Sequence, residues 1–448
     1  MSKVVKIKKG LDIPIKGAAP KELKDMPETL RFAVKPPDFK GLDLKLKSKQ
    51  DTEVKAGDVL MFDKKNNDIV LVSPVSGKVV EVNRGEKRRI LEVVVETTNP
   101  GEIIKHQTKG IDGLSREEII KLIQSAGLWP YIIMRPYGIV ARPDDKPRDI
   151  FISTFDSSPL GPDLDFALQD QKEDFFNGLK VLAKLTEGEV CLGLNKKNPG
   201  FFDEAKDVRK TYFNGPHPAG NVGIQIHNSK PLAKGDIAWT VQAQNVAMIG
   251  KLIANGEVTF DRTIAFAGSE VTQPGYYKVK VGADLNKLLD HTNKEEKLRY
   301  ISGNVLTGTK VDKHGYLGFY DSMVTVIPEG DEYEFFGWAM PRFKHFSISR
   351  AYFSWLMPGK KYKMNANMHG EERAFVITGE YEKVLPMDVM PVQLLKSAMY
   401  EDIDEMEKLG IFEVIEEDMA LCEFVCTSKM EVQSILRKGM DLMIKETM

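Results

Sequence analysis

The sequence predicts a multidomain protein of the α/β class, and three observations indicate this. With 448 residues the chain exceeds the size that one hydrophobic core usually serves. Its 42% hydrophobic and 29% charged residues are typical of folded proteins. The local pattern also changes along the chain, from short β-runs to alternating strands and helices, then to further β-runs, and to helices at the end.

Short β-runs separated by turn residues characterise the first part of the chain. Residues 59–62, 69–72 and 78–82 are three such runs, and Gly57 and Gly77 supply turns between them. This order resembles the barrel-sandwich of biotinyl and lipoyl carrier domains. We therefore predict a barrel-sandwich hybrid domain over residues 1–110.

Lysines near the predicted hairpin tip raise an alternative, a domain that carries a covalent lipoyl or biotinyl group. The carrier families place the modified lysine in an Asp-Lys-Ala or Met-Lys-Met context. Here the tip contains Asp63, Lys64 and Lys65, which match neither context. The sequence favours a structural domain and leaves the carrier as the alternative.

Strands and helices alternate over residues 111–256. A helix is expected after Ser115, because Glu118 completes a capping box and Leu114 with Ile119 forms a hydrophobic staple. We expect strands at residues 151–155, 190–194 and 223–227, and helices at 166–185 and 241–254. This alternation predicts a Rossmann-like α/β layer with a largely parallel sheet.

The last two hundred residues change pattern twice. Over residues 257–330, short β-runs surround one short helix, which fits a β-grasp-like module. A mixed β segment is expected over 331–380 and a helical region over 381–448. In the helix expected at 430–444 the apolar residues recur at helical spacing, which is typical of a helix that packs against a core or another subunit.

The apolar runs and the cysteines of the sequence indicate the cellular compartment of the chain. It contains no run of about 18 apolar residues and does not begin with a secretory signal, so we expect it to stay in the cytoplasm. The three cysteines, Cys191, Cys422 and Cys426, are too few for a disulfide framework, which agrees with a reducing compartment.

The formal net charge of -2 hides an asymmetry between the two ends. Residues 1–60 carry 14 Lys and Arg against 9 Asp and Glu, whereas residues 401–448 carry 5 against 13. Neither end contains a polybasic run of the kind that binds DNA. Nucleic acid is therefore not an expected partner.

The sequence contains no recognisable catalytic motif. It lacks a Walker A loop, a Gly-x-Gly-x-x-Gly turn that opens a helix, and a nucleophile motif. His217 and His227 lie ten residues apart without a carboxylate or thiol at metal spacing. An iron–sulfur cluster normally takes four thiolates, so three cysteines do not suffice. We expect no metal site and no catalytic residue.

The densest turn chemistry lies at residues 215–223, which contain two prolines and three glycines. Such a segment forms a loop rather than a helix, because prolines remove hydrogen-bond donors and glycines relax the backbone. Ligands often bind at loops that end the strands of an α/β sheet. Gly215, His217 and Gly220 are therefore candidate ligand contacts, and the alternative is a loop that only turns the chain.

Several stretches resemble one protein family, the A subunits of the sodium-translocating NADH:quinone reductases. They cover the chain from end to end in family order: GLDIPIKG (10–17), FDSSPL (155–160), GPHPAG (215–220), AMIGKL (247–252), SGNVLTG (302–308), FGW (336–338) and ALCEFVC (420–426). The resemblance implies a peripheral subunit on the cytoplasmic face of the bacterial inner membrane. The complex passes electrons from NADH to a quinone and exports sodium ions.

The same resemblance implies which groups this chain lacks and which partners it has. In that family FMN, FAD, riboflavin and the iron–sulfur centre belong to other subunits, so this chain is expected to bind no cofactor. The expected partners are those subunits, chiefly an integral membrane subunit, and the expected ligand is a quinone. More distant relatives, the C subunit of the Rnf complex and the flavin-binding subunit of respiratory complex I, share a barrel-sandwich, a Rossmann-like α/β domain and a β-grasp module.

One departure from those distant relatives points to the candidate site. They carry a glycine-rich loop that lets the backbone approach the flavin phosphate, whereas residues 127–138 here are bulky. This argues against the alternative of an autonomous flavin-dependent NADH dehydrogenase. The segment offers an apolar, aromatic surface with one charge, and the candidate quinone contacts are Trp129, Tyr131, Arg135 and Tyr137. The competing interpretation is that these side chains only refill a vacated pocket.

Overall fold

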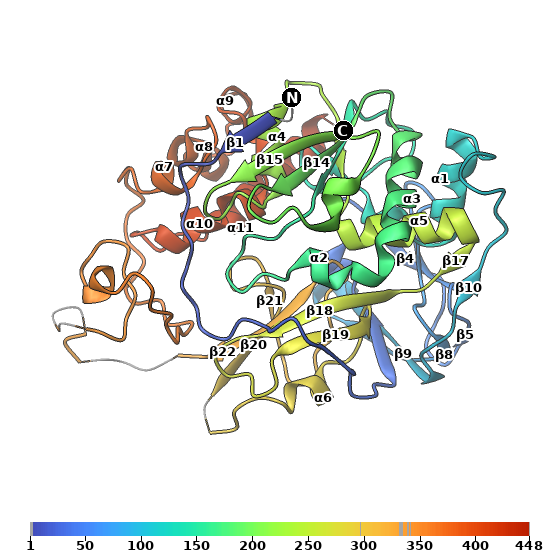
Figure 1. Cartoon of the computed structure of the whole chain (residues 1–448), viewed down its shortest axis with the longest axis horizontal. Coiled ribbons are helices and arrows are strands. Elements are labelled where there is room, and N and C mark those ends of the chain that lie inside the picture. The colour runs from blue at the N-terminus through green and yellow to red at the C-terminus, as the bar shows by residue number, and fades with distance from the viewer. Residues whose placement is uncertain (1–2, 296, 331–334, 338–339, 341, 448) are drawn as a thin grey trace.

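The computed structural model describes residues 3–295, 297–330, 335–337, 340 and 342–447. Within these ranges the chain forms five β-sheets and eleven α-helices, arranged as several units along the sequence (Figure 1). This confirms the predicted multidomain α/β class. Trp338, in the FGW stretch noted above, lies outside the described residues.

The barrel-sandwich near the N-terminus consists of two small antiparallel sheets. One contains β3 (Arg31–Val34), β9 (Ile90–Asn99), β8 (Ser76–Arg84) and β5 (Glu53–Val54), and the other contains β4 (Leu44–Leu46), β6 (Val59–Asp63) and β7 (Val70–Val72). The three predicted β-runs are confirmed as β6, β7 and β8. Between the sheets, Leu60, Val79 and Val93 are completely buried and form the core.

The largest sheet, which we call the central sheet, has seven strands in the order β1-β15-β14-β13-β16-β11-β12. Its strands are β1 (Lys3–Lys6), β15 (Arg209–Asn214), β14 (Val190–Asn195), β13 (Asp149–Ser153), β16 (Ala238–Thr240), β11 (Ile133–Arg135) and β12 (Ile139–Val140). The pairs from β1 to β16 are parallel, and the pairs β16–β11 and β11–β12 are antiparallel. The predicted, largely parallel sheet is confirmed.

Two helices beside this sheet, α3 (Lys172–Ala183) and α5 (Ala243–Asn255), pack closely because glycines lie at their contact. A Cβ added to Gly178 would lie 2.0 Å from the Val246 carbonyl oxygen, and one on Gly250 would lie 1.9 Å from the Asp174 oxygen. Helix α1 (Arg116–Ser125) begins as predicted, with Ser115 as its N-cap and a complete capping box to Glu118.

One predicted strand is wrong. Residues 223–227 lie in helix α4 (Val222–Ser229), not in a strand. The alternation of Ile224 and Ile226 with polar neighbours is typical of a half-buried strand. However, Gln225 is also buried, because its amide donates to Ser153 Oγ and to the Ala219 carbonyl. The sequence therefore shows the apolar–polar alternation of a half-buried strand, although the polar residue, Gln225, is buried in a helix.

The first residues of the chain pair with later parts of the sequence. Strand β1 pairs with β15, and β2 (Leu23–Lys24) pairs with β19 (Gly275–Lys280) in a six-stranded sheet. The other strands of this sheet are β18 (Asp261–Ala267), β22 (Met323–Pro328), β20 (Leu298–Ser302) and β21 (Thr309–Val311). With the short helix α6 (Asn286–Leu289) it forms the β-grasp-like unit. The predicted domain boundaries remain predictions, and these two strands lie in sheets outside the barrel-sandwich.

The mixed β segment predicted over 331–380 is not formed by the residues described there. They contain a 3-10 helix at Phe353–Leu356 and an isolated bridge between Ile15 and Tyr362. Pro358 and Gly359 interrupt the chain after that helix, and such residues favour turns over strands.

The chain ends in a helical region, as predicted. Its helices are α7 (Tyr381–Val384), α8 (Pro391–Met399), α9 (Ile403–Lys408), α10 (Glu416–Val425) and α11 (Val432–Thr447). The apolar stripe of α11 packs inward, since Leu436 and Met440 are completely buried. Across the described residues no helix is long and apolar enough to span a membrane.

Candidate functional site

A cleft of about 380 Å³ lies at the carboxyl ends of β13 and β16. Ser153 and Phe155 line it from the end of β13, and Thr240 from the end of β16. The N-terminal turns of α4 and α5 form another part of the wall, and the six-stranded unit closes the cleft with Asn304 and Met323. The cleft therefore lies where the central sheet meets the β-grasp-like unit and α10.

An aromatic cluster joins three units beside the cleft. Tyr131 stacks on Phe319 with ring centroids 4.3 Å apart and planes 14° apart. Phe39 of the barrel-sandwich packs on the same Phe319 at 4.5 Å, and Tyr320 meets the Tyr131 ring edge-on. Because these rings come from distant parts of the sequence, they fix the three units relative to one another.

Two buried polar side chains beside this cluster keep hydrogen-bonding capacity. Burial raises the pKa of Tyr131 to about 12, so its phenol stays protonated at neutral pH. Arg262 lies over the Tyr131 ring at 5.7 Å, and burial lowers the pKa of its guanidinium. Among the described residues the Tyr131 hydroxyl donates no hydrogen bond and Arg262 Nε has no partner, although the Arg262 guanidinium interacts with the Tyr131 hydroxyl and opposes the rise of its pKa. Buried polar groups are usually satisfied, so these two atoms are available to a ligand or water.

Arg135 connects the cleft wall to the C-terminal helices. Its guanidinium donates to Asp418 Oδ2 and to Glu417 Oε1, each at 2.8 Å, and the side chain is 2% exposed. Burial alone would lower the pKa of Arg135, but the carboxylates of Asp418 and Glu417 outweigh it and raise the pKa. A Cβ on Gly223 would lie 2.4 Å from the Asp418 carboxylate, so only glycine leaves room for this buried ion pair.

Two adjacent carboxylates of α10 have opposite pKa shifts. Burial would raise the pKa of Glu416, but Arg437 and Lys40 outweigh it and lower the pKa to about 2. Burial raises the pKa of Glu417, and the charge of Arg135 offsets this rise only in part. Glu417 lines the cleft and its side chain is 40% exposed, so water screens part of this effect.

The loop at residues 215–220 is fastened on both sides. The backbone N–H of His217 donates to Asp12 Oδ1 at 2.8 Å, and His217 Nδ1 lies 3.0 Å from Ser157 Oγ. The N–H of Gly220 donates to the same Ser157 hydroxyl at 2.8 Å. Burial lowers the pKa of His217 to about 4, so its imidazole is neutral at pH 7.

The structure brings together three of the seven candidate residues, since Tyr131, Arg135 and Gly220 all line the cleft. Their selection as quinone contacts remains a prediction. Arg135 is bound to two carboxylates, so the one charge of this segment is already paired within the chain.

The other four candidates lie outside the cleft lining. Trp129 is completely buried in the core, where its indole N–H donates to the Ala141 carbonyl at 2.8 Å. The Tyr137 hydroxyl lies 3.5 Å from Thr447 Oγ1 of α11. Gly215 packs against Ile7, and the side chain of His217 is buried. For Trp129 the structure favours the competing interpretation, a side chain that fills the core.

Several cleft residues were missed by the sequence analysis. Asp156 and Ser158 directly follow the predicted strand at 151–155, and polar residues after a buried strand are a signal that could have identified them. Asn304, Asp321 and Met323 come from the β-grasp-like unit. Nothing local in the sequence indicates that this unit packs over the central sheet.

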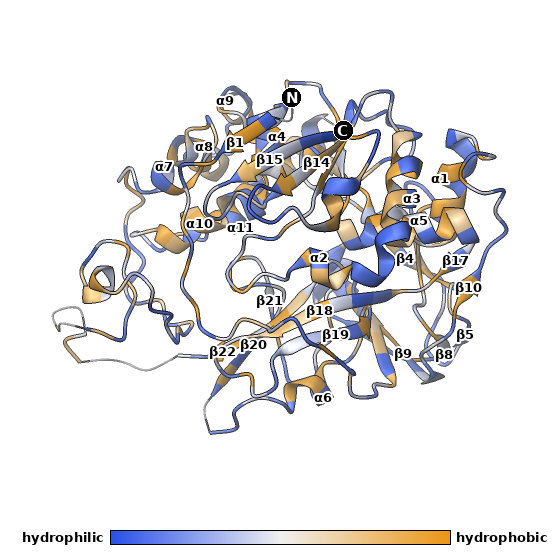
Figure 2. Cartoon of the chain, viewed as in Figure 1, coloured by the Kyte–Doolittle hydropathy of each residue, from blue (hydrophilic) through white to orange (hydrophobic). Residues whose placement is uncertain are grey.

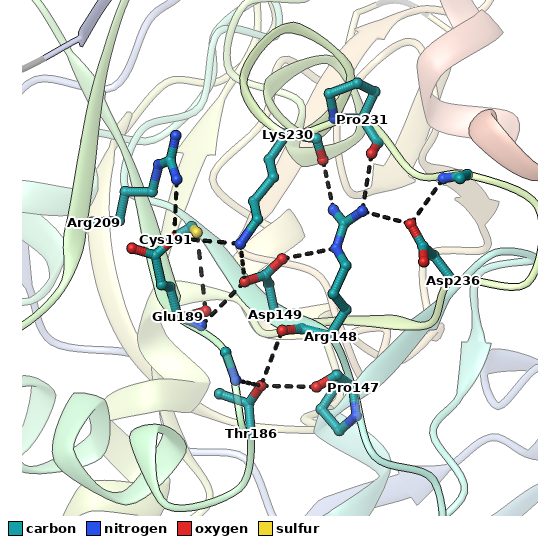
Figure 3. A network of polar contacts seen from close by, with 12 residues as sticks. Pro147, Arg148, Asp149, Thr186, Glu189, Cys191, Arg209, Lys230, Pro231 and Asp236 are labelled. Atoms are coloured by element: carbon teal, nitrogen blue, oxygen red, sulfur yellow. Dashed lines mark hydrogen bonds and ion pairs between the residues drawn. The ribbon is translucent and has the colours of Figure 1, made fainter.

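The opposite, amino ends of the same strands carry a network of ion pairs (Figure 3). Asp149, which is completely buried, accepts from Arg148 at 2.9 Å and from Lys230 at 2.5 Å. Glu189 pairs with Arg209 at 2.9 Å. Ligand atoms of Asp149, Glu189 and Cys191 lie within 4.8 Å of one another. Cations already occupy both carboxylates and burial raises the pKa of the Cys191 thiol to about 12, so this arrangement favours a structural network over a metal site.

These features define a class of protein: a barrel-sandwich, a largely parallel α/β layer and a β-grasp-like sheet beside a ligand-sized cleft. Three family models match this order. They describe the NqrA N-terminal barrel-sandwich hybrid domain at residues 5–98, the NqrA second alpha/beta domain at 114–258 and the NQRA C-terminal domain at 263–313.

Curated relatives match nearly the whole chain. The A subunit of the Na(+)-translocating NADH-quinone reductase from Photorhabdus laumondii is 37% identical over 438 residues, which cover 97% of this chain and 98% of the relative. The A subunits from Yersinia pestis bv. Antiqua and Rhodopirellula baltica are 38% and 36% identical, and cover 97% and 99% of this chain and 98% of each relative. The chain belongs to this family, the A subunits of the Na(+)-translocating NADH-quinone reductases, which confirms the resemblance.

Among solved structures, an NAD+-reducing [NiFe]-hydrogenase in the air-oxidized state aligns with a TM-score of 0.38 at 12% identity. The alignment covers 75% of this chain and 62% of that chain. A likeness this distant supports no argument about function.

Proposed function

We propose that the chain works as the A subunit of a sodium-translocating NADH:quinone reductase, peripheral on the cytoplasmic face of the bacterial inner membrane. In this role it docks on an integral membrane subunit. The other subunits hold FMN, FAD, riboflavin and the iron–sulfur centre, and the assembled complex couples NADH oxidation by a quinone to sodium export. The isolated chain has no activity of its own. The family membership over nearly the full length carries this proposal.

The proposed lack of a flavin is supported by the segment that follows α1. Trp129 and Ile132 are completely buried, so bulky side chains occupy the space beside the backbone. A phosphate cradle needs backbone N–H groups that a ligand can approach closely, which glycines permit and these side chains prevent.

An absorption spectrum and an intact mass of the purified chain test the absence of cofactors. We expect no band above the protein absorption and the mass of the bare polypeptide. A stoichiometric flavin or iron–sulfur chromophore would contradict the proposal in favour of an autonomous dehydrogenase. A mass increment at Lys64 or Lys65 would favour the carrier alternative.

The quinone contact proposed for this chain lies in the cleft at the carboxyl ends of β13 and β16. A quinone headgroup is flat and apolar and has two carbonyl oxygens that accept hydrogen bonds. The cleft offers the ring of Phe155 and the side chain of Met323 as apolar surface, and the Tyr131 hydroxyl as an unused donor. Its volume of about 380 Å³ lies within the usual range of small-molecule sites.

Binding of a short-chain ubiquinone analogue to the purified chain tests this contact. Thr307 is exposed and lines the cleft, so Thr307→Trp should fill part of it without disturbing the core. We expect the affinity for the analogue to fall about tenfold. Thr309 is also exposed but does not line the cleft, and Thr309→Trp is the matched control. Equal affinities for the two variants would place quinone elsewhere or on another subunit.

A further inference from the structure

Residues 342–377 form a segment that we name the arm. It lies at one end of the molecule, apart from the sheets, and is the orange stretch at the left of Figure 1. Large apolar side chains on it are exposed: Phe343 by 58%, Trp355 by 51% and Ile377 by 60%. Figure 2 shows apolar residues on this segment beside hydrophilic ones. Contiguous exposed apolar surface usually marks an interaction site.

A groove of about 580 Å³ runs between the arm and α10, and we name it the apolar groove for its large apolar side chains, although charged residues such as Glu423 and Lys429 also line it. The arm contributes Ile348 and Met368, which are 40% and 51% exposed, and α10 contributes Phe424, which is 39% exposed. Met364 and Met430 also line it. Methionine side chains adapt to irregular apolar partners, so this groove suits apolar side chains of another polypeptide.

A second groove of about 730 Å³ lies between the arm and residues beside β20 and β22 of the six-stranded unit, and it is strongly basic. Its described lining contains one carboxylate, Glu295, and six lysines, which come from three distant stretches of the chain: Lys16, Lys297, Lys344, Lys360, Lys361 and Lys363. Lys363 pairs with Glu270 at 3.1 Å, and Lys297 also has a partner within the chain, but the other four lysines still outnumber the one carboxylate of the lining. The excess of positive charge indicates an anionic occupant.

The two grooves are continuous. Lys344, His345, Lys363 and Asn365 line both of them. Together they form one hollow with an apolar part and a lysine-rich part. A flat bilayer surface does not enter a concave hollow, whereas an extended polypeptide does. The shape therefore favours a protein segment over lipid headgroups.

We propose that this two-part groove docks an extended segment of an integral partner subunit, with acidic side chains in the lysine-rich part and apolar side chains in the apolar part. This inference rests on the proposed function, because it requires a membrane partner. Opposite charges accelerate association and are screened by salt, whereas apolar contacts are not. The two parts of the groove therefore make separable contributions to binding.

Rebinding to membranes tests the docking groove. The full chain is mixed with membranes from cells that produce the other subunits but lack this one, and the bound fraction is measured by sedimentation at low and high salt. The variant Lys344→Glu/Lys361→Glu reverses two exposed lysines of the basic part. We expect its affinity to fall about thirtyfold at low salt and the difference to shrink at high salt. Lys65→Glu/Lys121→Glu changes the charge equally on exposed residues elsewhere and should bind as the wild type does.

The apolar part has its own variant. Met368→Asp places a charge in the apolar groove, and we expect an affinity loss of about tenfold that salt does not relieve. Met399→Asp, at an exposed methionine outside both grooves, is its control. Thermal unfolding of each variant in isolation verifies that it is folded.

The outcomes separate the docking groove from the proposed function. If the wild type binds these membranes and all four variants bind equally well, the proposal that the groove docks the partner is wrong, while the proposed peripheral role stands. If the wild type does not bind them, the proposed peripheral role itself fails. Equal binding to protein-free vesicles of phosphatidylethanolamine and phosphatidylglycerol would replace the polypeptide partner with a lipid surface.

Discussion

The two ends of the central parallel sheet differ in how completely their polar groups are satisfied. At the amino ends, Asp149 and Glu189 meet Arg148, Arg209 and Lys230, and none of these residues lines the cleft or either groove described above (Figure 3). At the carboxyl ends, a cleft remains, and the Tyr131 hydroxyl beside it donates no hydrogen bond to the described residues. We call the amino ends the closed end of the sheet, because their charged groups are paired and stabilise the fold. We call the carboxyl ends the open end, because the cleft there has room for a ligand.

Of the predictions made here, the removal of the Asp149 carboxylate should lower the free energy of unfolding most, because this carboxylate pairs two cations at the amino ends of the sheet. Asp149→Ala leaves Arg148 and Lys230 without their buried carboxylate partner, and both cations are about one-third exposed, so water relieves part of the cost. We expect the free energy of unfolding to fall by about 3 kcal/mol in denaturant titrations. Quinone affinity of the folded protein should not change.

The matched control for Asp149→Ala is Glu187→Ala. Glu187 pairs with Lys146, but both side chains are mostly exposed. Exposed pairs contribute little, so this variant should unfold as the wild type does. Equal losses in the free energy of unfolding would show that the amino-end network stabilises the fold no more than an exposed ion pair does.

The second prediction concerns pH and the two carboxylates of α10. The pKa of Glu416 is lowered from 4.5 to about 2, so its stabilising contribution is complete above about pH 4.5 and is lost as the pH falls towards 2. Glu416→Gln should lower the free energy of unfolding by about 2 kcal/mol at pH 7, less than the full shift implies because Lys40 is half exposed. The difference from the wild type should vanish near pH 2.

Glu417→Gln provides the comparison for Glu416→Gln. Burial raises the pKa of Glu417, so its ionised form stabilises the folded state less than that of Glu416 does, and a neutral glutamine replaces it at little cost. Unfolding measured between pH 3 and 8 therefore distinguishes the two sites. A larger loss from Glu417→Gln than from Glu416→Gln at pH 7 would contradict these opposite shifts.

The third and smallest effect is expected at the open end. Tyr131→Phe removes a buried hydroxyl that donates no hydrogen bond to the described residues, so stability should be unchanged or slightly higher. If a quinone carbonyl accepts from this hydroxyl, affinity for the ubiquinone analogue should fall about fivefold. Loss of stability without loss of affinity would show that the hydroxyl serves the fold alone.

The sequence predicted those features that depend on neighbouring residues. The capping box at Ser115 and Glu118 involves residues three positions apart, and the structure contains it. The strand wrongly predicted at 223–227 failed because burial of Gln225 depends on Ser153, which is 72 residues away.

The candidate site was predictable only in part, for the same reason. Arg135 was identified as a charge in an apolar segment, but its partner Asp418 lies 283 residues further along the chain. Asn304 and Met323 reach the cleft because the six-stranded unit packs over the central sheet, and no local pattern indicates that packing. Of the aromatic candidates at 129–137, Tyr131 lines the cleft, whereas Trp129 fills the core instead of facing it.

The most direct test of a quinone contact at the open end of the sheet is photolabelling of the assembled complex. A photoreactive quinone is bound and activated, and the labelled peptides of this chain are identified by mass spectrometry. The account predicts labels at Tyr131, at residues 153–158 and at residues 303–323, with protection by excess unlabelled quinone. Labels confined to the barrel-sandwich, the arm or other subunits would contradict it.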